Sequence, residues 1–213
     1  MLSNFTVIRW YHIRVLEIVL VLVSYFSGAV PYSVWLGKVY LRADIRKFGD
    51  GNPGATNVFR AGNNYVGLLA LILDINKAAL PVGIAYNLLG VRGMPMFLIG
   101  LAPVLGHIFS PFLKFRGGKA LAVSFGTWIG LTVWKISAPA VIAATVGTLL
   151  VTPVGWAVLL ALIVILVVIL GWLPDPLFLS TWVAQAILLT WTHLDDLKQS
   201  PQLRPWLRKI IYR

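Results

Sequence analysis

The chain of 213 residues contains no cysteine, and charged residues make up only 12% of it. The lack of cysteine excludes a disulfide, a thiolate nucleophile and a cysteine-based metal site. Soluble domains carry about 25% charged residues, so this low charge, beside 59% hydrophobic residues, excludes an ordinary soluble protein. We therefore expect an all-α integral membrane protein, because helices satisfy their own backbone polar groups inside a bilayer.

Acidic residues are also scarce, with 7 Asp and Glu against 18 Lys and Arg. In a membrane protein this excess of positive charge indicates first which loops face the cytoplasm and contact anionic lipid. It indicates an anionic substrate only second. The basic residues lie in short loops between apolar segments, which is a poor arrangement for binding nucleic acid. We expect membrane lipid as a partner, no nucleic acid and no obligate protein partner.

Apolar segments near membrane-spanning length recur along the whole chain. They cover about residues 15–40, 65–89, 94–109, 121–134, 136–151, 155–170 and 177–191. The sequence thus predicts a single transmembrane domain over residues 1–213, with about seven transmembrane helices and polar cytoplasmic loops that form the site. Pro31 is expected to kink the first helix and to free a carbonyl that only protein or water can satisfy.

The distribution of loop cations predicts the orientation. An N-terminus outside the cell leaves few cations on the outer face: Arg9, Arg14, Arg92 and Lys135. The inner face then holds Arg42, Arg46, Lys47, Arg60, Lys114, Arg116, Lys119, Lys198, Arg204, Arg208, Lys209 and Arg213. By the positive-inside rule we expect a multi-pass protein of the cell (inner) membrane, with both polar loops and the C-terminus cytoplasmic.

Residues 44–64, the first polar loop, form the longest polar stretch. Three glycines, Gly49, Gly51 and Gly54, stand beside Arg46 and Lys47. Glycine backbones can converge their N–H groups on an anion, so the loop is typical of a phosphate cradle; a solvated basic loop is the alternative. The letters also match the dinucleotide fingerprint GxGxxG, but that motif requires a strand before it, and here charged residues precede it.

Two further polar features lie downstream. Residues 110–119, the second polar loop, end in Gly117-Gly118-Lys119 but lack the spacing of a nucleotide-binding P-loop. Asp74 and Lys77 lie one turn apart on one helix face, which indicates a buried pair with a structural role rather than a catalytic one. The two polar loops and the tail (residues 192–213) share the inner face, so they are expected to meet at one site.

At this point the motifs resemble those of the bacterial acyl-phosphate:glycerol-3-phosphate acyltransferases. Residues 28–57 are similar to their first motif, and residues 106–119, with His107, to their second. His193 resembles the His of the third motif, and Asp74 with Lys77 matches an Asp and Lys pair. The resemblance implies transfer of a fatty acyl group from acyl phosphate to glycerol 3-phosphate, giving lysophosphatidic acid and phosphate for phospholipid synthesis.

The resemblance also implies roles for the polar residues. Acyl phosphate is already activated, so no cofactor and no metal is expected, and the protein has to position two anions and stabilise an oxyanion. The catalytic candidates are His193, Arg46 and Lys119, with His193 taking the hydroxyl proton; an anchor for the helix end is its alternative role. The substrate-binding candidates are Ser33, Lys47, Gly49, Gly51, Asn52, Gly54, Thr56, Asn57, Lys114, Arg116, Gly117, Gly118 and Asp196.

Several positions depart from the family pattern. Ala29 stands where the family has Ser, with Ser33 one helical turn further on as a partial replacement. Thr192 stands where the family has Arg, Asp196 stands where it has Asn, and Ala120 stands where it has Gly. Altered activity or a changed acceptor is therefore open, as are two other functions, a non-catalytic sensor and a transporter of a phosphorylated metabolite. A transporter would require a polar path across the membrane, for which only Asp74 and Lys77 are candidates.

Overall fold

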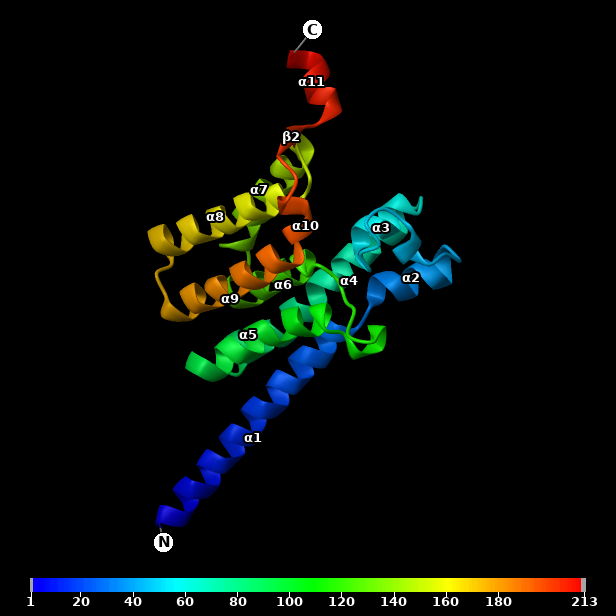
Figure 1. The fold of residues 1–213 in the computed structure, drawn as a ribbon. Coiled ribbons are helices and arrows are strands. Elements are labelled where there is room, and N and C mark those ends of the chain that lie inside the picture. The colour runs from blue at the N-terminus through cyan, green and yellow to red at the C-terminus, as the bar shows by residue number, and fades with distance from the viewer. Residues whose placement is uncertain (1, 212–213) are drawn as a thin grey trace.

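The computed structural model describes the backbone of residues 2–211 and the side chains of residues 14–211. This part of the chain is almost wholly helical (Figure 1). The longer helices are α1 (Leu2–Ala29), α2 (Tyr32–Tyr40), α4 (Asn64–Gly83), α5 (Gly93–Ile108), α6 (Leu121–Thr132), α7 (Ser137–Leu150), α8 (Gly155–Trp172) and α9 (Pro176–Thr192). The shorter ones are η1 (Ile45–Lys47), α3 (Ala55–Arg60), η2 (Ile84–Leu88), η3 (Pro111–Leu113), α10 (Leu194–Leu197) and α11 (Pro205–Ile211). Strands β1 (Val151–Thr152) and β2 (Gln202–Leu203) pair antiparallel.

The apolar helices fall at the predicted segments. Within the described residues, four segments are long and apolar enough to cross a membrane: Arg14–Tyr40, Asn64–Leu88, Gly93–Leu113 and Gly155–Trp172. Three shorter apolar helices, α6, α7 and α9, have 12, 14 and 17 residues. Because about 20 residues cross a bilayer, the total of seven spans stays a prediction. The helical membrane fold itself is confirmed.

Pro31 breaks the first apolar segment, as predicted. Pro31 carries no N–H, and α1 ends at Ala29 while α2 begins at Tyr32. Two carbonyls released by the break are satisfied by side chains from distant segments: Ser110 Oγ of the second polar loop donates to Ala29 O at 2.6 Å, and Lys77 Nζ of α4 donates to Val30 O at 2.9 Å. The break thereby gathers segments that lie far apart in the sequence.

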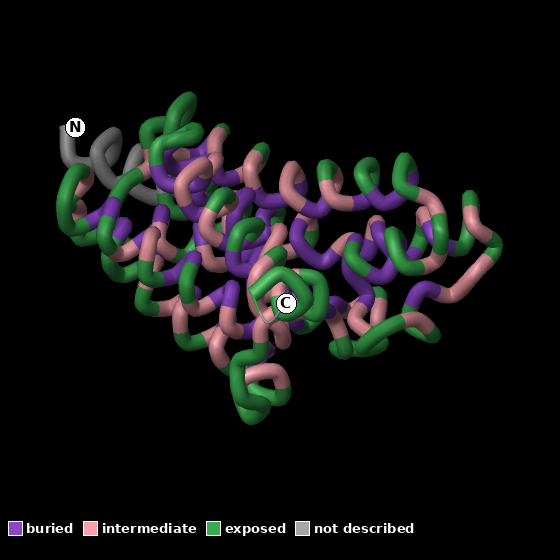
Figure 2. The backbone as a smooth tube through the Cα atoms, turned by 90° about the horizontal axis from the view of Figure 1, so that it is seen from above, coloured by how far each residue is buried: buried purple, intermediate pink, exposed green. Residues whose placement is uncertain are grey.

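Close helix pairs build the body of the molecule, with α1 against α5, α4 against α6 and α7 against α8. Glycines permit these contacts. A Cβ at Gly106 of α5 would meet the carbonyl oxygen of Tyr25 in α1, and a Cβ at Gly126 of α6 would meet the carbonyl oxygen of Ile75 in α4. Most helices have buried and exposed residues within the same turns (Figure 2), and the exposed side chains include many large apolar ones such as Ile163 and Ile187. Such an apolar exterior is what a lipid-embedded bundle requires.

The first polar loop is fixed to the bundle by a small apolar cluster. Ile45 at the start of η1 is fully buried, and Gly37 of α2 has no side chain where Ile45 packs. Val58 of α3 is likewise fully buried in the same cluster. At the far end of the sequence, the β1–β2 pair ties the tail to the turn after α7, and Arg204 N donates to Leu150 O at 2.9 Å. Both anchored segments border the site.

Candidate active site

A cavity of about 300 Å³, the site cavity, lies where the two polar loops, the turn after α7 and the tail meet. Its polar lining includes Asp50, Asn52, Thr56, Arg60, Asp74, His107, Lys119, Thr152, His193, Asp196 and Arg204. The predicted convergence of separate polar segments is therefore confirmed. A larger cavity of about 710 Å³, the flanking cavity, shares Asp50, Asn52 and Lys119 with it and adds Arg46 and Arg116.

Lys119 links the two polar loops and the tail. Its ammonium lies 3.1 Å from Asp50 Oδ2 in the first polar loop and 3.0 Å from Asp196 Oδ2 in the tail. Burial lowers the pKa of Lys119, but the two carboxylates outweigh burial and hold that pKa above its ordinary value. Burial raises the pKa of Asp50, and the hydrogen bonds from Lys119, Asn52 and Asn57 more than reverse it. Lys119 and Asp50 are thus both charged at neutral pH.

Asparagines shape the first polar loop around Asp50. Asp50 Oδ1 accepts from the backbone N of Asn52 at 3.2 Å and from Asn57 Nδ2 at 3.1 Å. Asn52 Oδ1 in turn accepts from the backbone N of Lys119 at 3.0 Å, which joins the two polar loops directly. Asn57 is almost fully buried, and its Oδ1 accepts from Arg60 Nη1 at 3.0 Å. Both asparagines therefore act on the loop scaffold in this structure.

Glycines in both loops are needed for close approach. Gly49 and Gly51 have φ of +56° and +74°, in the left-handed region that favours glycine, and a Cβ at Gly49 would meet Arg60. In the second polar loop, a Cβ at Gly118 would meet His107 Nε2, and one at Gly117 would meet the carbonyl oxygen of His107. The paired glycines thus fold back onto the end of α5.

His193 is buried at the junction of α9 and α10 and lines the site cavity. Its Nδ1 lies 2.8 Å from the carbonyl oxygen of Leu189. A carbonyl only accepts, so Nδ1 carries the proton and Nε2 carries the lone pair. Burial, the largest effect, lowers the pKa of His193 below its ordinary value of 6.5. A neutral imidazole with a free Nε2 is equipped to accept a proton.

The two departures in the third motif have structural roles here. Thr192 Oγ1 donates to the carbonyl oxygen of Lys119 at 3.1 Å, which fixes the second polar loop against the end of α9. Asp196 is paired with Lys119, so its negative charge is compensated. His193 is oriented by a backbone carbonyl, and no hydrogen bond joins it to Asp196 among the described side chains.

Other predicted site residues lie further from the site cavity. Arg46 lines the flanking cavity, where it forms a bidentate pair with Asp44 at 2.9 and 2.7 Å and lowers the pKa of Asp44 to about 2. Arg116 also lines the flanking cavity. Lys47 and Lys114 are exposed and line neither of the two cavities.

Ser33 does not occupy the place predicted for it. The sequence suggested that Ser33 continues the helical face of Ala29, but the break at Pro31 separates the two residues. Ser33 is fully buried, and its Oγ donates to Asp74 Oδ2 at 2.7 Å. Asp74 in turn lies 2.8 Å from Lys77 Nζ, so the predicted buried pair is confirmed and Ser33 is part of its setting. Ala29 itself is buried.

Sequence reasoning missed two cations of the site cavity. Arg60 was predicted as a cation of the first polar loop but was not among the candidate site residues, yet it lines the cavity beside Asn57 and lies 3.8 Å from Asp50. Arg204 was counted as one of the tail cations, yet its Nε donates to the carbonyl oxygen of Thr148 at 3.0 Å, at the mouth formed by β1 and β2. The sequence feature that could have indicated a fixed position for Arg204 is its place between Pro201 and Pro205, because prolines limit the conformations of the tail.

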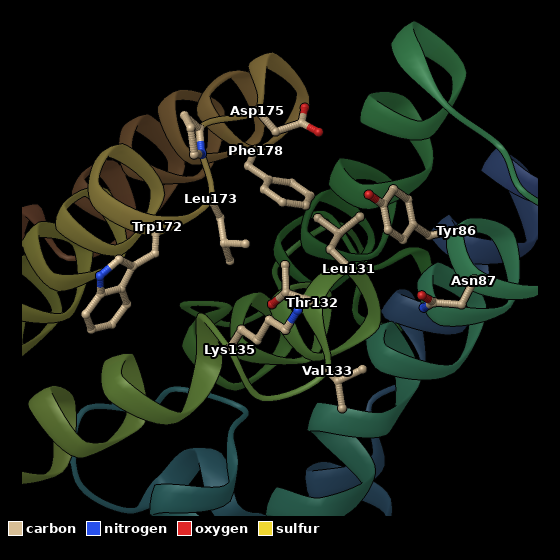
Figure 3. Close-up of a pocket in the computed structure, with 11 residues that line it drawn as sticks. Tyr86, Asn87, Leu131, Thr132, Val133, Lys135, Trp172, Leu173, Asp175 and Phe178 are labelled. Atoms are coloured by element: carbon tan, nitrogen blue, oxygen red, sulfur yellow. The ribbon is translucent and has the colours of Figure 1, made fainter.

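Another cavity, of about 500 Å³, lies among the turns that connect α6 to α7 and α8 to α9 (Figure 3). Its lining combines apolar side chains, among them Trp172, Phe178 and Leu131, with polar ones, and Lys135 is its one basic residue. Asp175 also lines it, but its Oδ1 accepts from the backbone N of Leu177 and caps α9. None of the residues in the three family-like motifs lines it, so we assign it no part in catalysis.

No group of three or more His, Cys, Asp or Glu side chains is placed to hold a metal ion within the part of the chain that the structure describes. The charges at the site cavity are instead those of Arg60, Lys119 and Arg204 against Asp50 and Asp196, while Asp74 is paired internally with Lys77. Such a set suits anions held by Arg and Lys.

Comparisons with known proteins agree on one family. The family pattern described as glycerol-3-phosphate acyltransferase matches residues 18–201. A protein of that name from Desulfovibrio desulfuricans is 33% identical over 205 residues, covering 91% of this chain and 86% of that one. One from Aromatoleum aromaticum is 38% identical over 159 residues, covering 67% and 78%. A third, from Enterococcus faecalis, is 44% identical over 109 residues, and the match spans half of that protein.

A solved structure shares the fold. The crystal structure of PlsY, described as an integral membrane glycerol 3-phosphate acyltransferase in its glycerol 3-phosphate form, superposes with a TM-score of 0.76 at 26% identity. The superposition covers 85% of this chain and 90% of PlsY. The lysophosphatidic acid form of PlsY gives a TM-score of 0.73. The chain therefore belongs to the glycerol-3-phosphate acyltransferase family of integral membrane proteins.

Proposed function

We propose that this protein transfers a fatty acyl group from acyl phosphate to glycerol 3-phosphate, giving 1-acyl-glycerol 3-phosphate and phosphate for phospholipid synthesis. Family membership supports acylation of glycerol 3-phosphate. The observation that carries the proposal is the meeting of Lys119 and a neutral His193 at the site cavity, while Gly117 and Gly118 line the flanking cavity that Lys119 also borders. The same membership disfavours the sensor and the transporter.

The residues at the site cavity are compatible with acyl phosphate as the donor. The chain has no cysteine, and threonines are the hydroxyl residues that line the site cavity. An acyl phosphate is a mixed anhydride whose leaving group is phosphate, so the substrate hydroxyl can attack it without a covalent enzyme intermediate. Cationic side chains that hold the phosphate of the acceptor can also hold the phosphate of the donor.

Two neighbouring cavities suit two anionic substrates. Arg60, Lys119 and Arg204 face the site cavity, while Arg46 and Arg116 face the flanking cavity. Lys119 lines both, so it is the residue placed to contact either phosphate. We assign the backbone of residues 49–54 to cradling glycerol 3-phosphate, with Arg46 and Arg116 at the second phosphate. For this, a phosphate must replace part of the pairing between Lys119 and its two carboxylates.

The proton transfer is assigned to His193. Its Nε2 accepts the proton of the glycerol hydroxyl as the hydroxyl oxygen attacks the acyl carbon. The tetrahedral intermediate then collapses, the bond between the acyl carbon and the phosphate oxygen breaks, and phosphate leaves. The imidazolium returns its proton to the departing phosphate, so the atoms and charges balance.

The pH dependence of kcat/KM tests this role. Only neutral His193 can accept a proton, and burial lowers its pKa below 6.5. Activity is therefore expected to be retained as the pH falls through 6.5 and to be lost only at lower pH. A variant His193→Gln is expected to lose about 10²–10⁴-fold in kcat and to lose this acid limb. An acid limb that is unchanged in the variant belongs to the substrate phosphate, and that result would contradict the assignment.

The donor is tested with radiolabelled glycerol 3-phosphate in nanodiscs. Palmitoyl phosphate, palmitoyl coenzyme A and a palmitoyl carrier protein are supplied in separate reactions, and label that enters lipid is counted. We expect label in lipid with palmitoyl phosphate alone. Label that enters lipid from a thioester, with none from palmitoyl phosphate, would contradict acyl phosphate as the donor. It would still agree with glycerol 3-phosphate as the acceptor.

We also propose a single membrane domain in the cell (inner) membrane, with the N-terminus outside and the site and C-terminus in the cytoplasm. The distribution of loop cations supports it. In this orientation the site meets the cytoplasm, where glycerol 3-phosphate is dissolved, and the acyl chain stays among the apolar helices.

Cysteine labelling tests the orientation directly, because the natural chain has no cysteine. Gln199→Cys in the tail and Lys135→Cys after α6 both replace exposed residues. A membrane-impermeant maleimide added to intact spheroplasts is expected to label the variant at position 135, and to label that at position 199 only after permeabilisation. The opposite pattern would show that the topology is inverted.

A further inference from the structure

Lys77 sits at the centre of a buried polar network beside the site cavity. Its Nζ lies 2.8 Å from Asp74 Oδ1, 2.9 Å from Val30 O and 2.8 Å from His107 Nδ1. Asp74, Lys77 and His107 are all buried. The ammonium group thus has two hydrogen-bond partners, Val30 O and His107 Nδ1, and one counter-charge, the carboxylate of Asp74.

The charge state of this network follows from its partners. Asp74 faces the ammonium at Oδ1 and accepts from Ser33 Oγ at Oδ2, the setting of an ionised carboxylate. An ionised Asp74 inside the membrane requires a compensating cation, and Lys77 is that cation. An ammonium group donates and never accepts. His107 Nδ1 must therefore accept, and the ring proton resides on Nε2.

The protonated edge of His107 faces the site. A Cβ at Gly118 would meet His107 Nε2 and would lie 3.1 Å from Asn52 Oδ1, so Nε2 reaches the seam between the two polar loops. His107 also lines the site cavity together with Lys119 and His193. Among the side chains of residues 14–211, no hydrogen-bond acceptor is found for Nε2. The N–H is thus available to a molecule in the cavity.

The two histidines of the cavity are held in opposite tautomers by the groups that their Nδ1 atoms contact. His193 donates from Nδ1 to the carbonyl oxygen of Leu189, which leaves a lone pair on Nε2. His107 accepts at Nδ1 from Lys77, which leaves a proton on Nε2. One ring can take a proton, and the other can only donate a hydrogen bond. Acyl transfer needs both kinds of group.

We propose that Lys77 fixes His107 as an Nε2–H donor to the oxygen that becomes negatively charged on the acyl group. This rests on the acyl transfer proposed above. When the glycerol oxygen bonds to the acyl carbon, the π electrons of the carbonyl move to its oxygen, and that oxyanion accepts from Nε2–H. Collapse restores the carbonyl and breaks the bond to phosphate. His107 keeps its proton throughout, and Lys77 acts as a positioning residue.

Two amide variants of His107 test the donor. Glutamine can place its amide N–H near the position of Nε2, whereas asparagine reaches only to the position of Nδ1. We expect His107→Asn to lose about 10²-fold or more in kcat with little change in KM, because the bond forms only in the transition state, and His107→Gln to stay within about tenfold of wild type. Equal kcat values for the two variants, beside an active wild type, would overturn the role of His107.

Nitrogen NMR tests the tautomers independently of activity. The chain has three histidines, so protein labelled with ¹⁵N in its imidazole rings gives few signals, which His107→Gln and His193→Gln assign. We expect His107 to be protonated at Nε2 and His193 at Nδ1. A His107 proton on Nδ1 would overturn the inference. Wild-type protein that transfers no acyl group would overturn the proposed function and, with it, the oxyanion role.

Discussion

Replacing Lys119 with alanine is expected to lower kcat/KM by about 10³-fold, because one change removes the cation and leaves two carboxylates facing the substrates. The Lys119 ammonium lies 3.1 Å from Asp50 and 3.0 Å from Asp196. Without it, Asp196 loses its counter-charge and Asp50 keeps only the longer contact of 3.8 Å with Arg60, so the two acids repel phosphate. The initial rate of acyl transfer in nanodiscs, measured over a range of glycerol 3-phosphate concentrations, gives kcat/KM.

A second variant separates the loss of the cation from the repulsion by the carboxylates. Adding Asp196→Asn to Lys119→Ala removes one repelling charge, so we expect KM to recover in part while kcat stays low. The control is Lys38→Ala, which removes an exposed lysine that lines none of the three cavities described above and is expected to leave the rate unchanged. Wild-type activity in Lys119→Ala would exclude Lys119 from the site.

Replacing Asp74 with leucine is expected to destabilise the folded protein by about 3–5 kcal/mol, because it leaves the ammonium of Lys77 buried without a counter-charge. Asp74 is 2% exposed and Lys77 is 4% exposed, so water cannot take the place of the lost partner. The free energy of unfolding, measured by steric trapping in detergent micelles, gives the size of the effect.

The double variant Asp74→Leu/Lys77→Met is expected to be more stable than Asp74→Leu, because it removes the uncompensated charge as well. It remains less stable than wild type, since Val30 O and Ser33 Oγ each lose a hydrogen-bond partner. Asp175→Ala serves as a matched control; it removes an N-cap of α9 and is expected to cost about 1 kcal/mol. A double variant less stable than Asp74→Leu would argue against a buried ion pair.

The sequence was sufficient for features that depend on a single segment. Pro31 lacks an N–H wherever it stands, so the end of α1 could be predicted without knowing its neighbours. Asp74 and Lys77 lie one turn apart on any helix, and two opposite charges within a membrane segment have to pair. The family motifs identified the loops that meet at the cavity.

Features that depend on contacts between segments could not be predicted. The partners of Lys119 lie 69 residues before it and 77 after it, at Asp50 and Asp196, and no local pattern encodes such distances. Arg204 reaches the cavity only because β2 pairs with β1, two strands too short to leave a sequence signal. Ser33 turned toward Asp74 because the break at Pro31 redirected α2.

Phosphate release by the purified protein in lipidic medium tests the central claim most directly. Palmitoyl phosphate is supplied with and without glycerol 3-phosphate, and inorganic phosphate is measured over time. We expect release that depends on glycerol 3-phosphate, with one acylated glycerol 3-phosphate formed for each phosphate. Bound palmitoyl phosphate without release, in the presence of glycerol 3-phosphate, would contradict the acyltransferase account.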